Sequence, residues 1–454
     1  MRSPGNLMSR SNDEQKAVSM KLSTRFGLMA AFALPAMTPA LAVAPPPVTQ
    51  PAAIDEVRAF HDQRDGRAFW FAADNAAAVL LTMVEQASLD GLDPSRYPIA
   101  ELRRLAANVQ SGSDRDRRIA EQVFSSVFVQ YAGDVARERN VRTLYVDPAA
   151  RPRPVSVARV LRVAAAAPSL AAYVEQMAWM NPYYPALRGA LADEIRGANE
   201  PRRVRLLALN LDRARVLPRG AGDYILVNSA AARLDFYAAG KLKDSMRVVV
   251  GEVAQQTPMM AGMVRYAILN PYWHVPSDLA RTRLAPRVLS EGLSYLRKKG
   301  YEVVSDWSVD AKIIPIEAID WKAVASGKVK VKVRQRPGPL NGMGEVKFMF
   351  PNDLGIYLHD TPGKALFQKR ERTFSAGCVR LEDAQGLKRL ILGNTPLASS
   401  TKPEQYVPLA RPVPVFLTYF TAYPQGGKIV ERPDVYKRDL KELASAGTPV
   451  QAAR

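Results

Sequence analysis

Metal-ligating and disulfide-forming residues are scarce in this sequence, which has one cysteine and three histidines among 454 residues. One cysteine cannot form an internal disulfide, and the dispersed histidines give no spacing typical of a zinc site. We therefore expect neither a metal site nor a cofactor. Long hydrophobic runs are also missing. Beyond the N-terminal segment, no stretch reaches the roughly 18 uncharged apolar residues of a membrane-spanning helix.

Acidic residues are outnumbered by basic ones, 44 against 63, and the formal net charge is +19. Such a charge limits the partners to anionic ones. The arginines are scattered along the chain without a basic run interleaved with aromatic residues, which disfavours nucleic acid. A polyanionic cell envelope satisfies the same electrostatics, so the charge alone does not choose between these partners.

The N-terminal segment argues for export. Lys21 and Arg25 precede a short apolar stretch, residues 26–34, and an A-x-A pattern ends at Ala42. These features predict a cleaved signal peptide over residues 1–42, with an uncleaved membrane anchor as the alternative. Either outcome places the protein outside the cytoplasm, which argues against nucleic acid. In an oxidising compartment a lone cysteine is a liability unless its thiol has a use.

The rest of the chain divides into a helical part and a strand-rich part. A linker rich in proline and alanine, residues 43–54, comes first. Apolar residues at helical spacing then predict a helical domain over residues 55–198. Its helices are expected at residues 74–87, 114–138, 155–165, 170–180 and 184–196. The last residues, 441–454, are expected to form a disordered tail.

From about residue 200 to residue 440 the apolar residues alternate, which predicts strands. The expected strands are residues 224–228, 233–237, 246–251, 264–269, 346–350, 356–359 and 415–419. Many short strands separated by turns indicate a β-sandwich or a barrel, and we expect a sandwich-like domain. An interruption at about residues 271–340 is too long for an ordinary loop and predicts an inserted lid subdomain. The expected fold class is therefore α+β.

Two short segments carry a pattern typical of cysteine catalysis. Residues 375–380 read SAGCVR, and residues 357–362 read YLHDTP. A cysteine nucleophile needs a base or a cation to form its thiolate, and His359 and Arg380 can fill these roles for Cys378. The glycine before the cysteine lets the backbone turn sharply, so that amide N–H groups can face a developing oxyanion.

These segments and several others resemble the L,D-transpeptidases that remodel peptidoglycan, specifically the larger Gram-negative type with a helical scaffold domain. The resemblance is carried by NLDRAR (210–215), GEVAQQTP (251–258), NPYWHVP (270–276), RQRPGPLNGMGEVKFMFPN (334–352), YLHDTP, SAGCVR, TYFTAYPQGG (418–427) and PDVY (433–436). It implies a periplasmic enzyme in which Cys378 is the nucleophile and His359 is its base. The substrate implied is the stem peptide of peptidoglycan, with cell-wall synthesis proteins or outer-membrane proteins as further candidate partners.

The implied reaction is acyl transfer in two steps. Cys378 attacks the carbonyl of the third stem residue and expels the terminal D-alanine, and an amine of a neighbouring stem then forms a 3–3 cross-link. We assign the oxyanion and substrate site to Gly377, Arg380, Tyr357, Ser375, Asp360 and Trp273. Tyr357 could equally pack in the core. Asp360 follows the base directly, so a backbone carbonyl of this loop is a better candidate to orient the imidazole.

Two features depart from the family pattern. Ala376 stands where the usual SHGC block has a second histidine, so the role of that histidine is lost or taken over, with Arg380 as a candidate. A peptidoglycan-binding-like module of the relatives is missing, because residues 190–195 run almost directly into residues 202–209. Three alternative functions remain open: an L,D-carboxypeptidase, a transferase that anchors outer-membrane proteins to peptidoglycan, and a non-catalytic wall-binding scaffold.

Overall fold

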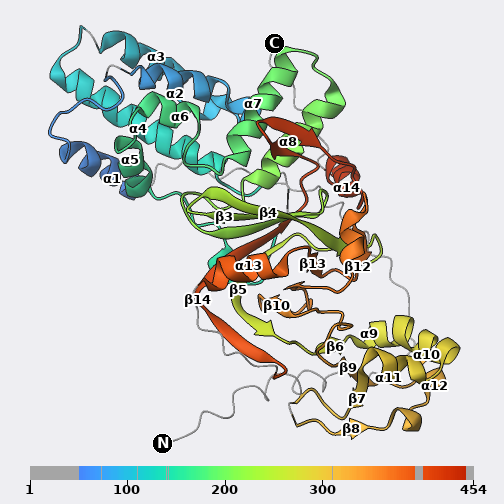
Figure 1. Cartoon of the computed structure of the whole chain (residues 1–454). Helices are drawn as coiled ribbons and strands as arrows, with labels where there is room; N and C mark the ends of the chain where they lie inside the picture. The colour runs from blue at the N-terminus through green and yellow to red at the C-terminus, as the bar shows by residue number, and fades with distance from the viewer. Residues whose placement is uncertain are drawn as a thin grey trace, which may run out of the picture. The chain divides into compact units, whose positions relative to one another are not determined.

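Helices form the first part of the structure, a computed structural model that describes residues 51–445 except positions 73, 110, 140, 142, 309 and 394–401. The predicted signal peptide lies outside the described residues. The helices, blue to green in Figure 1, are α1 (Pro51–Asp62), α2 (Ala76–Glu85), α3 (Ile99–Asn108), α4 (Asp114–Val135), α5 (Val157–Ala165), α6 (Leu170–Glu175) and α7 (Tyr183–Arg196). A capping box between Ser113 and Asp116 begins α4, whose apolar residues at helical spacing bury one face.

The helical pattern continues past residue 200, where we expected alternation. α8 (Pro201–Ala214) begins with a proline in its first turn, where the missing N–H is not needed. Arginines early in the helix interrupt the apolar pattern, but Val204, Leu207 and Leu211 keep helical spacing. These side chains share one hydrophobic core with Tyr224 of the strand-rich part. The expected change from helical to alternating pattern at residue 200 was therefore wrong, and α8 connects the helical part to the sheet.

One large sheet forms the second part of the structure. Its strands are β1 (Leu144–Tyr145), β2 (Tyr224–Asn228), β3 (Arg233–Ala238), β4 (Lys241–Gly251), β5 (Met260–Leu269), β10 (Val346–Met349), β11 (Leu358–His359), β12 (Thr373–Ser375), β13 (Val379–Leu381) and β14 (Gln405–Thr418). The strand order is β1-β5-β10-β11-β13-β4-β3-β2-β14, with β12 beside β4. Because β14 also pairs with β5, the strand path closes on itself, as in the barrel alternative. The α+β fold class is confirmed.

Side chains alternate between the two faces of the strands, so one face of the sheet packs in the core and the other carries the site. Phe348, Leu358 and Val379 point to a common hydrophobic core, which α13 (Ala384–Leu392) also joins. The neighbouring residues on each strand point to the opposite face, because side chains alternate along a strand. That opposite face carries the side chains of His359 and of Arg380.

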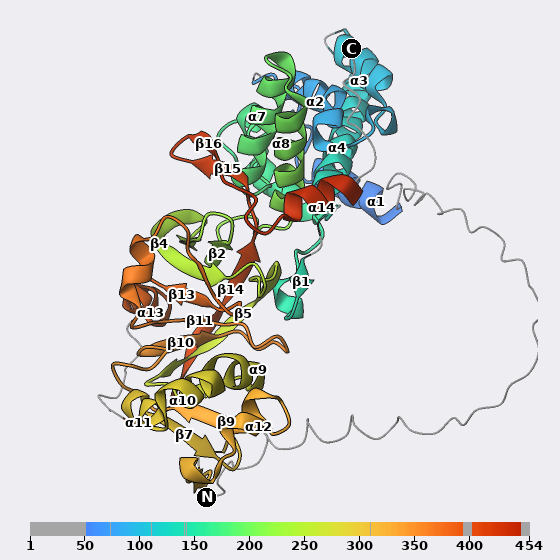
Figure 2. The ribbon, with the colours of Figure 1, turned by 90° about the vertical axis from the view of Figure 1, so that its right-hand side faces the viewer.

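The residues of the predicted lid form a small sheet with helices packed on it (Figure 1 and Figure 2, yellow to orange). Its strands, in the order β6-β9-β7-β8, are β6 (Trp273–Val275), β9 (Lys332–Gln335), β7 (Tyr301–Val304) and β8 (Ile313–Ile314). The helices are α9 (Ser277–Leu279), η4 (Ala280–Leu284), α10 (Ala285–Glu291), α11 (Ser294–Lys299) and α12 (Trp321–Ala325). A separate hydrophobic core holds this small subdomain together.

The chain after β14 is ordered further than we expected. A hairpin of β15 (Ala422–Gln425) and β16 (Lys428–Glu431) precedes α14 (Arg438–Ser445). The predicted disordered tail began at residue 441, but α14 continues to Ser445 because Glu442 pairs with Arg213 of α8 at 2.7 Å. Among the residues that the structure describes, no helix is long and apolar enough to cross a membrane.

Candidate active site

Strand pairing brings four predicted site residues to one face of the sheet. β11 and β13 are parallel, with His359 opposite Arg380, and the Val379 N–H donates to the Tyr357 carbonyl. Tyr357 comes directly before β11 and Cys378 directly before β13, and Tyr357 and Arg380 both lie close enough to the Cys378 thiol to act on its pKa. The Tyr357 and His359 rings meet edge to face, with centroids 5.7 Å apart. A thiol, an imidazole, a guanidinium and a phenol are thus gathered on one face.

His359 is a buried imidazole with a fixed orientation. Its Nδ1 lies 2.5 Å from the backbone carbonyl oxygen of Asp360. Because a carbonyl only accepts, Nδ1 carries the proton and Nε2 is the free basic nitrogen. Burial lowers the pKa of His359 to about 3, and Arg380 acts in the same direction. The imidazole is therefore neutral at physiological pH.

The Asp360 carboxylate is used elsewhere. It accepts hydrogen bonds from Lys364 Nζ at 2.8 Å and from the Glu345 N–H at 3.0 Å. The backbone carbonyl of Asp360, rather than its side chain, therefore contacts the His359 ring.

The Cys378 thiol is half-buried and donates a hydrogen bond to the Gly355 carbonyl oxygen at 3.3 Å. Burial raises the pKa of this thiol to about 11, although the Tyr357 N–H and hydroxyl and the Arg380 charge oppose the rise. Among the described residues, the thiol forms a hydrogen bond with the Gly355 carbonyl and none with His359. The resting pair is thus a thiol and a neutral imidazole, and the thiolate must form as a substrate is attacked.

Arg380 is a partly buried cation beside the thiol. Burial lowers the pKa of Arg380, Cys378 raises it, and Arg283 of the small subdomain lowers it. Its Nε is buried and has no hydrogen-bond partner among the described residues. A guanidinium in this condition can stabilise a thiolate or bind a carboxylate of a ligand.

The turn before the nucleophile is held by Ser375. Gly377 has a φ of 107°, which favours glycine. The Gly377 N–H donates to Ser375 Oγ at 3.2 Å, and the Ser375 hydroxyl donates to the Cys378 carbonyl at 2.5 Å. The Cys378 N–H has no hydrogen-bond partner among residues that the structure describes. Of the N–H groups of Gly377 and Cys378, only that of Cys378 therefore lacks a partner within the described part of the chain and is available to an oxyanion.

The side chains of Trp273 and His274 contact other residues of the small subdomain and its flanking segment. Trp273 packs on Gly342, where a Cβ atom would lie 3.0 Å from the indole, and its ring centroid is 6.1 Å from that of Tyr301. The His274 ring lies 4.9 Å from the Trp307 ring, and burial lowers the pKa of His274. These contacts describe packing and give no support to the substrate role expected for Trp273.

Two residues of the site escaped prediction. Lys347 lies opposite His359 in the β10–β11 pair, is buried, and forms an ion pair with Glu404 at 3.5 Å. Because side chains alternate along β10, Lys347 lies on the face opposite the core, the face that carries His359. Applying the alternation to every residue of this strand would have predicted its position. Thr257 donates a hydrogen bond from its hydroxyl to the Gly377 carbonyl at 2.7 Å. Nothing local in the sequence signals this second contact.

The small subdomain contacts the loop that surrounds the nucleophile. Arg283 of η4 pairs with Glu252 at 2.6 Å, and Gln255 donates to Asp278 at 3.4 Å. Ala376, at the position of the missing histidine, packs against the hydrophobic core of the subdomain. Across residues 51–445, outside the gaps, no group of three or more His, Cys, Asp or Glu side chains could hold a metal ion.

The chain matches two protein families over separate ranges. Residues 222–413 match the family model described as the L,D-transpeptidase catalytic domain, and residues 55–191 match a scaffold domain. A Haemophilus influenzae protein provisionally named as an L,D-transpeptidase is 32% identical over 276 residues. This match covers 59% of the chain and 55% of that protein, so the chain spans about half the length of this relative.

A solved structure gives a weaker likeness. The L,D-transpeptidase from Mycobacterium smegmatis is 10% identical, with a TM-score of 0.23, over 44% of this chain and 59% of that chain. This similarity is too low to bear on the fold or the activity.

The two family matches correspond to the two parts of the structure, a helical scaffold and a β-rich catalytic domain. Residues 222–413 match the L,D-transpeptidase catalytic-domain family, and the resemblance inferred from the motifs of the chain is confirmed. His359, Cys378 and Arg380 all lie within the matched catalytic range, whereas the residues after 413 lie outside it.

Proposed function

We propose that the protein is a peptidoglycan L,D-transpeptidase that uses Cys378 as its nucleophile. The observation that supports this most is the β11–β13 pairing, which gathers the thiol, the imidazole and the guanidinium on one face. The match of residues 222–413 to the catalytic-domain family supports a transferase that acts on stem peptides of peptidoglycan. The net charge of +19 suits a polyanionic wall.

The first step of the proposed reaction forms a thioester. As Cys378 attacks the carbonyl carbon of the third residue of a tetrapeptide stem, normally meso-diaminopimelate, His359 Nε2 accepts the thiol proton. The Cys378 N–H stabilises the tetrahedral oxyanion, a type of contact typically worth about 3 kcal/mol. Collapse of this intermediate breaks the bond to D-alanine. The imidazolium returns its proton to the leaving amine, and D-alanine departs.

The second step consumes the thioester. An amine of a neighbouring stem attacks the thioester carbonyl, His359 accepts its proton, and the Cys378 sulfur leaves and regains a proton. The product is a 3–3 cross-link. Water in place of the amine would make the protein an L,D-carboxypeptidase, and an amine of an outer-membrane protein would make it an anchoring enzyme.

The test is mass spectrometry of a disaccharide-tetrapeptide incubated with the protein and, in parallel, with a Cys378→Ala variant. We expect a dimer lighter by one D-alanine with the wild type only. Cysteine-dependent tripeptide without dimer would favour the carboxypeptidase or an acceptor missing from the mixture. No change in either sample would contradict the transpeptidase and favour the non-catalytic scaffold.

We also propose that the protein acts in the periplasm after export. The basic residues, apolar stretch and A-x-A pattern of residues 21–42 support this location. N-terminal sequencing of protein recovered from the envelope should begin at Val43. An N-terminus upstream of the apolar stretch in membrane-bound protein would favour the uncleaved anchor instead.

A further inference from the structure

A buried hydroxyl from outside the nucleophile motif holds the carbonyl of Gly377. Thr257 Oγ1 contacts the Gly377 carbonyl oxygen at 2.7 Å and the Gly251 N–H at 2.9 Å. An N–H only donates and a carbonyl only accepts, so the single hydroxyl hydrogen points to Gly377. Thr257 has no exposed surface, so water does not compete for this hydrogen bond.

This hydrogen bond sets the direction of the Cys378 N–H. The carbonyl of Gly377 and the N–H of Cys378 belong to one planar trans peptide and point in opposite directions. Because the carbonyl turns toward Thr257, the N–H points away from Thr257, and it has no partner among the described residues. Glycine allows many orientations of the adjoining peptide, so an outside contact is needed to select one of them.

The loop that carries Thr257 is held in turn by a C-terminal segment, residues 434–442, here called the strap. The Tyr436 hydroxyl donates to the Gly251 carbonyl at 2.6 Å. Arg438 Nη2 donates to the Thr257 carbonyl at 2.8 Å. The two ends of the loop are therefore both bonded to the strap.

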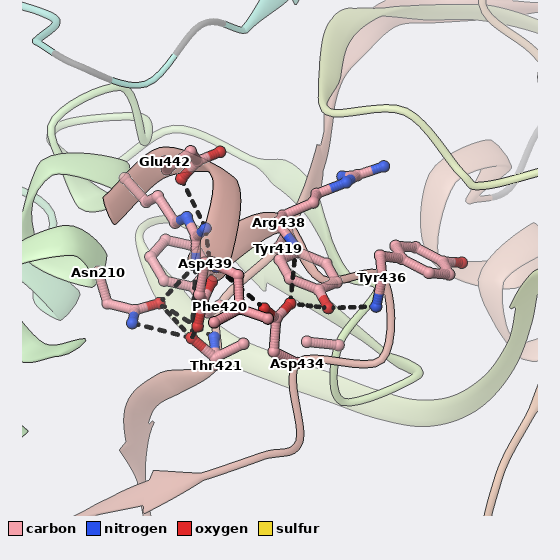
Figure 3. Close-up of polar contacts among 12 residues, drawn as sticks. Asn210, Tyr419, Phe420, Thr421, Asp434, Tyr436, Arg438, Asp439 and Glu442 are labelled. Carbon is pink, nitrogen blue, oxygen red and sulfur yellow. Dashed lines mark hydrogen bonds and ion pairs between the residues drawn. The ribbon is translucent and has the colours of Figure 1, made fainter. Parts of the chain in front are cut away.

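Buried polar contacts fix the strap, as Figure 3 shows. The Tyr419 hydroxyl donates to Asp434 Oδ1 at 2.7 Å and accepts from the Tyr436 N–H at 2.8 Å. The rings of Tyr419 and Tyr436 stack with centroids 5.3 Å apart. Arg213 of α8 forms an ion pair with Asp439 at 2.7 Å. A continuous set of contacts thus leads from α8 through the strap to the nucleophile turn.

We propose that Thr257 is a positioning residue that aims the Cys378 N–H at the oxyanion, and that the strap keeps Thr257 in place. The inference rests on the proposed acyl-transfer function. It adds the residues that orient the oxyanion donor. The strap lies beyond residue 413, outside the range matched by the catalytic family. The hydrogen bonds of Tyr436 and Arg438 to residues 251 and 257 link the strap to the site.

Two reactions of the Cys378 thiol distinguish a role of Thr257 in positioning the N–H from a role in the stability of the fold alone. Acylation by p-nitrophenyl acetate passes through a tetrahedral oxyanion and releases p-nitrophenolate, whereas alkylation by iodoacetamide forms no oxyanion. For Thr257→Val, which keeps the side-chain shape, we expect acylation to fall by about 10²-fold, the usual loss for one oxyanion donor. Alkylation should stay within about twofold, and Thr257→Ser should restore acylation because it restores the hydroxyl.

The outcomes distinguish this inference from the proposed function. Equal losses in both reactions, or no loss in either, would overturn the positioning role. A wild-type protein that reacts with the ester but releases no D-alanine from a stem peptide would refute the proposed function while the inference stands. A wild-type protein that is alkylated but never acylated would overturn both.

The strap is tested by Tyr436→Phe, which keeps the ring stacked on Tyr419 and removes the hydrogen bond to Gly251. We expect acylation to fall by about three- to tenfold, the effect of one hydrogen bond, with alkylation unchanged. The matched control is Tyr423→Phe, whose hydroxyl bonds to Gln425 in the β15–β16 hairpin. An unchanged Tyr436→Phe variant, or an equal loss in the control, would overturn the role of the strap.

Discussion

His359 and Arg380 lie opposite each other across the parallel β11–β13 pair, so a neutral imidazole sits beside a fixed guanidinium. The cation lowers the pKa of the imidazole, and it also lowers the pKa of the Cys378 thiol. It therefore weakens the base while it favours the nucleophile's charged form. Substitutions and pH titrations separate these two effects.

Removal of the cation should make the thiol less reactive. In Arg380→Gln we expect the pKa of Cys378 to rise and the rate of iodoacetamide alkylation at pH 9 to fall by about tenfold, the effect of one pKa unit. Arg389→Gln is a matched control, because Arg389 is an exposed arginine on α13. A similar loss in the control, or none in Arg380→Gln, would contradict the assigned influence of Arg380.

The wild-type thiol should titrate at high pH. Burial raises its pKa to about 11, so little thiolate is present at neutral pH. The alkylation rate should therefore rise by about tenfold per pH unit from pH 7 toward pH 11 and then level off. A plateau reached near pH 8 would show instead that the free enzyme holds a preformed thiolate.

A side chain at Gly377 should damage the nucleophile turn. Gly377→Ala puts a residue with a side chain at a backbone φ of 107°, which favours glycine. It also places a Cβ atom 2.9 Å from Ile356 Cδ1. We expect the free energy of unfolding to fall by about 1–3 kcal/mol, measured by chemical denaturation. Acylation should fall by about 10²-fold as the Cys378 N–H is misplaced.

The matched control for this substitution is Gly66→Ala. Gly66 has a φ of 75°, and a Cβ atom there would meet nothing within 4 Å. It should lower the free energy of unfolding by about 1 kcal/mol without affecting acylation. Full activity in Gly377→Ala would mean that the turn tolerates another backbone geometry.

Acid should destabilise the helical part through His61. Its Nε2 lies 2.9 Å from Ser125 Oγ, and its ring meets Phe60 edge to face. Burial lowers the pKa of His61 to about 4, below the value of roughly 6.5 in the unfolded chain. The unfolded state thus binds the proton more readily, and stability present above pH 6.5 is lost as the pH falls toward 4.

The contribution of His61 can be isolated with His61→Phe, which keeps an aromatic ring and removes the titration. We expect Tm to decline less steeply between pH 6.5 and pH 4 in this variant than in the wild type. His359, whose pKa is also lowered, is present in both proteins and cancels in the comparison. Equal slopes would show that His61 is free to take up a proton in the folded state.

Local patterns predicted the catalytic sheet well because each strand has one face in a common core. Tyr224 and Arg233 begin strands where the alternation placed them. The nucleophile and base were predictable because each lies in a short motif. Their meeting depends on the pairing of β11 with β13, two strands that are not consecutive in the chain. The resemblance implied that the two residues act together, which the alternation alone could not show.

The misjudged elements depend on distant contacts. α8 was missed because its arginines hide the helical spacing, and its apolar face is explained only by the core that it shares with Tyr224. The order of α14 relies on ion pairs with Arg213, far away in the chain. Thr257 reaches the nucleophile turn only in the folded protein, so a local pattern gives it no signal.

The double pairing of β14 has a consequence for how the chain folds. This strand pairs with β5 and with β2, and it is the last strand of the large sheet along the described chain. Until it arrives, both partner strands present unpaired edges, which invite association between molecules. Pairings so distant in sequence form slowly, because the loop-closure entropy is lost before the contacts are gained. A chain cut before Gln405 would keep the nucleophile motif yet expose two open strand edges, and it should aggregate in proportion to its concentration.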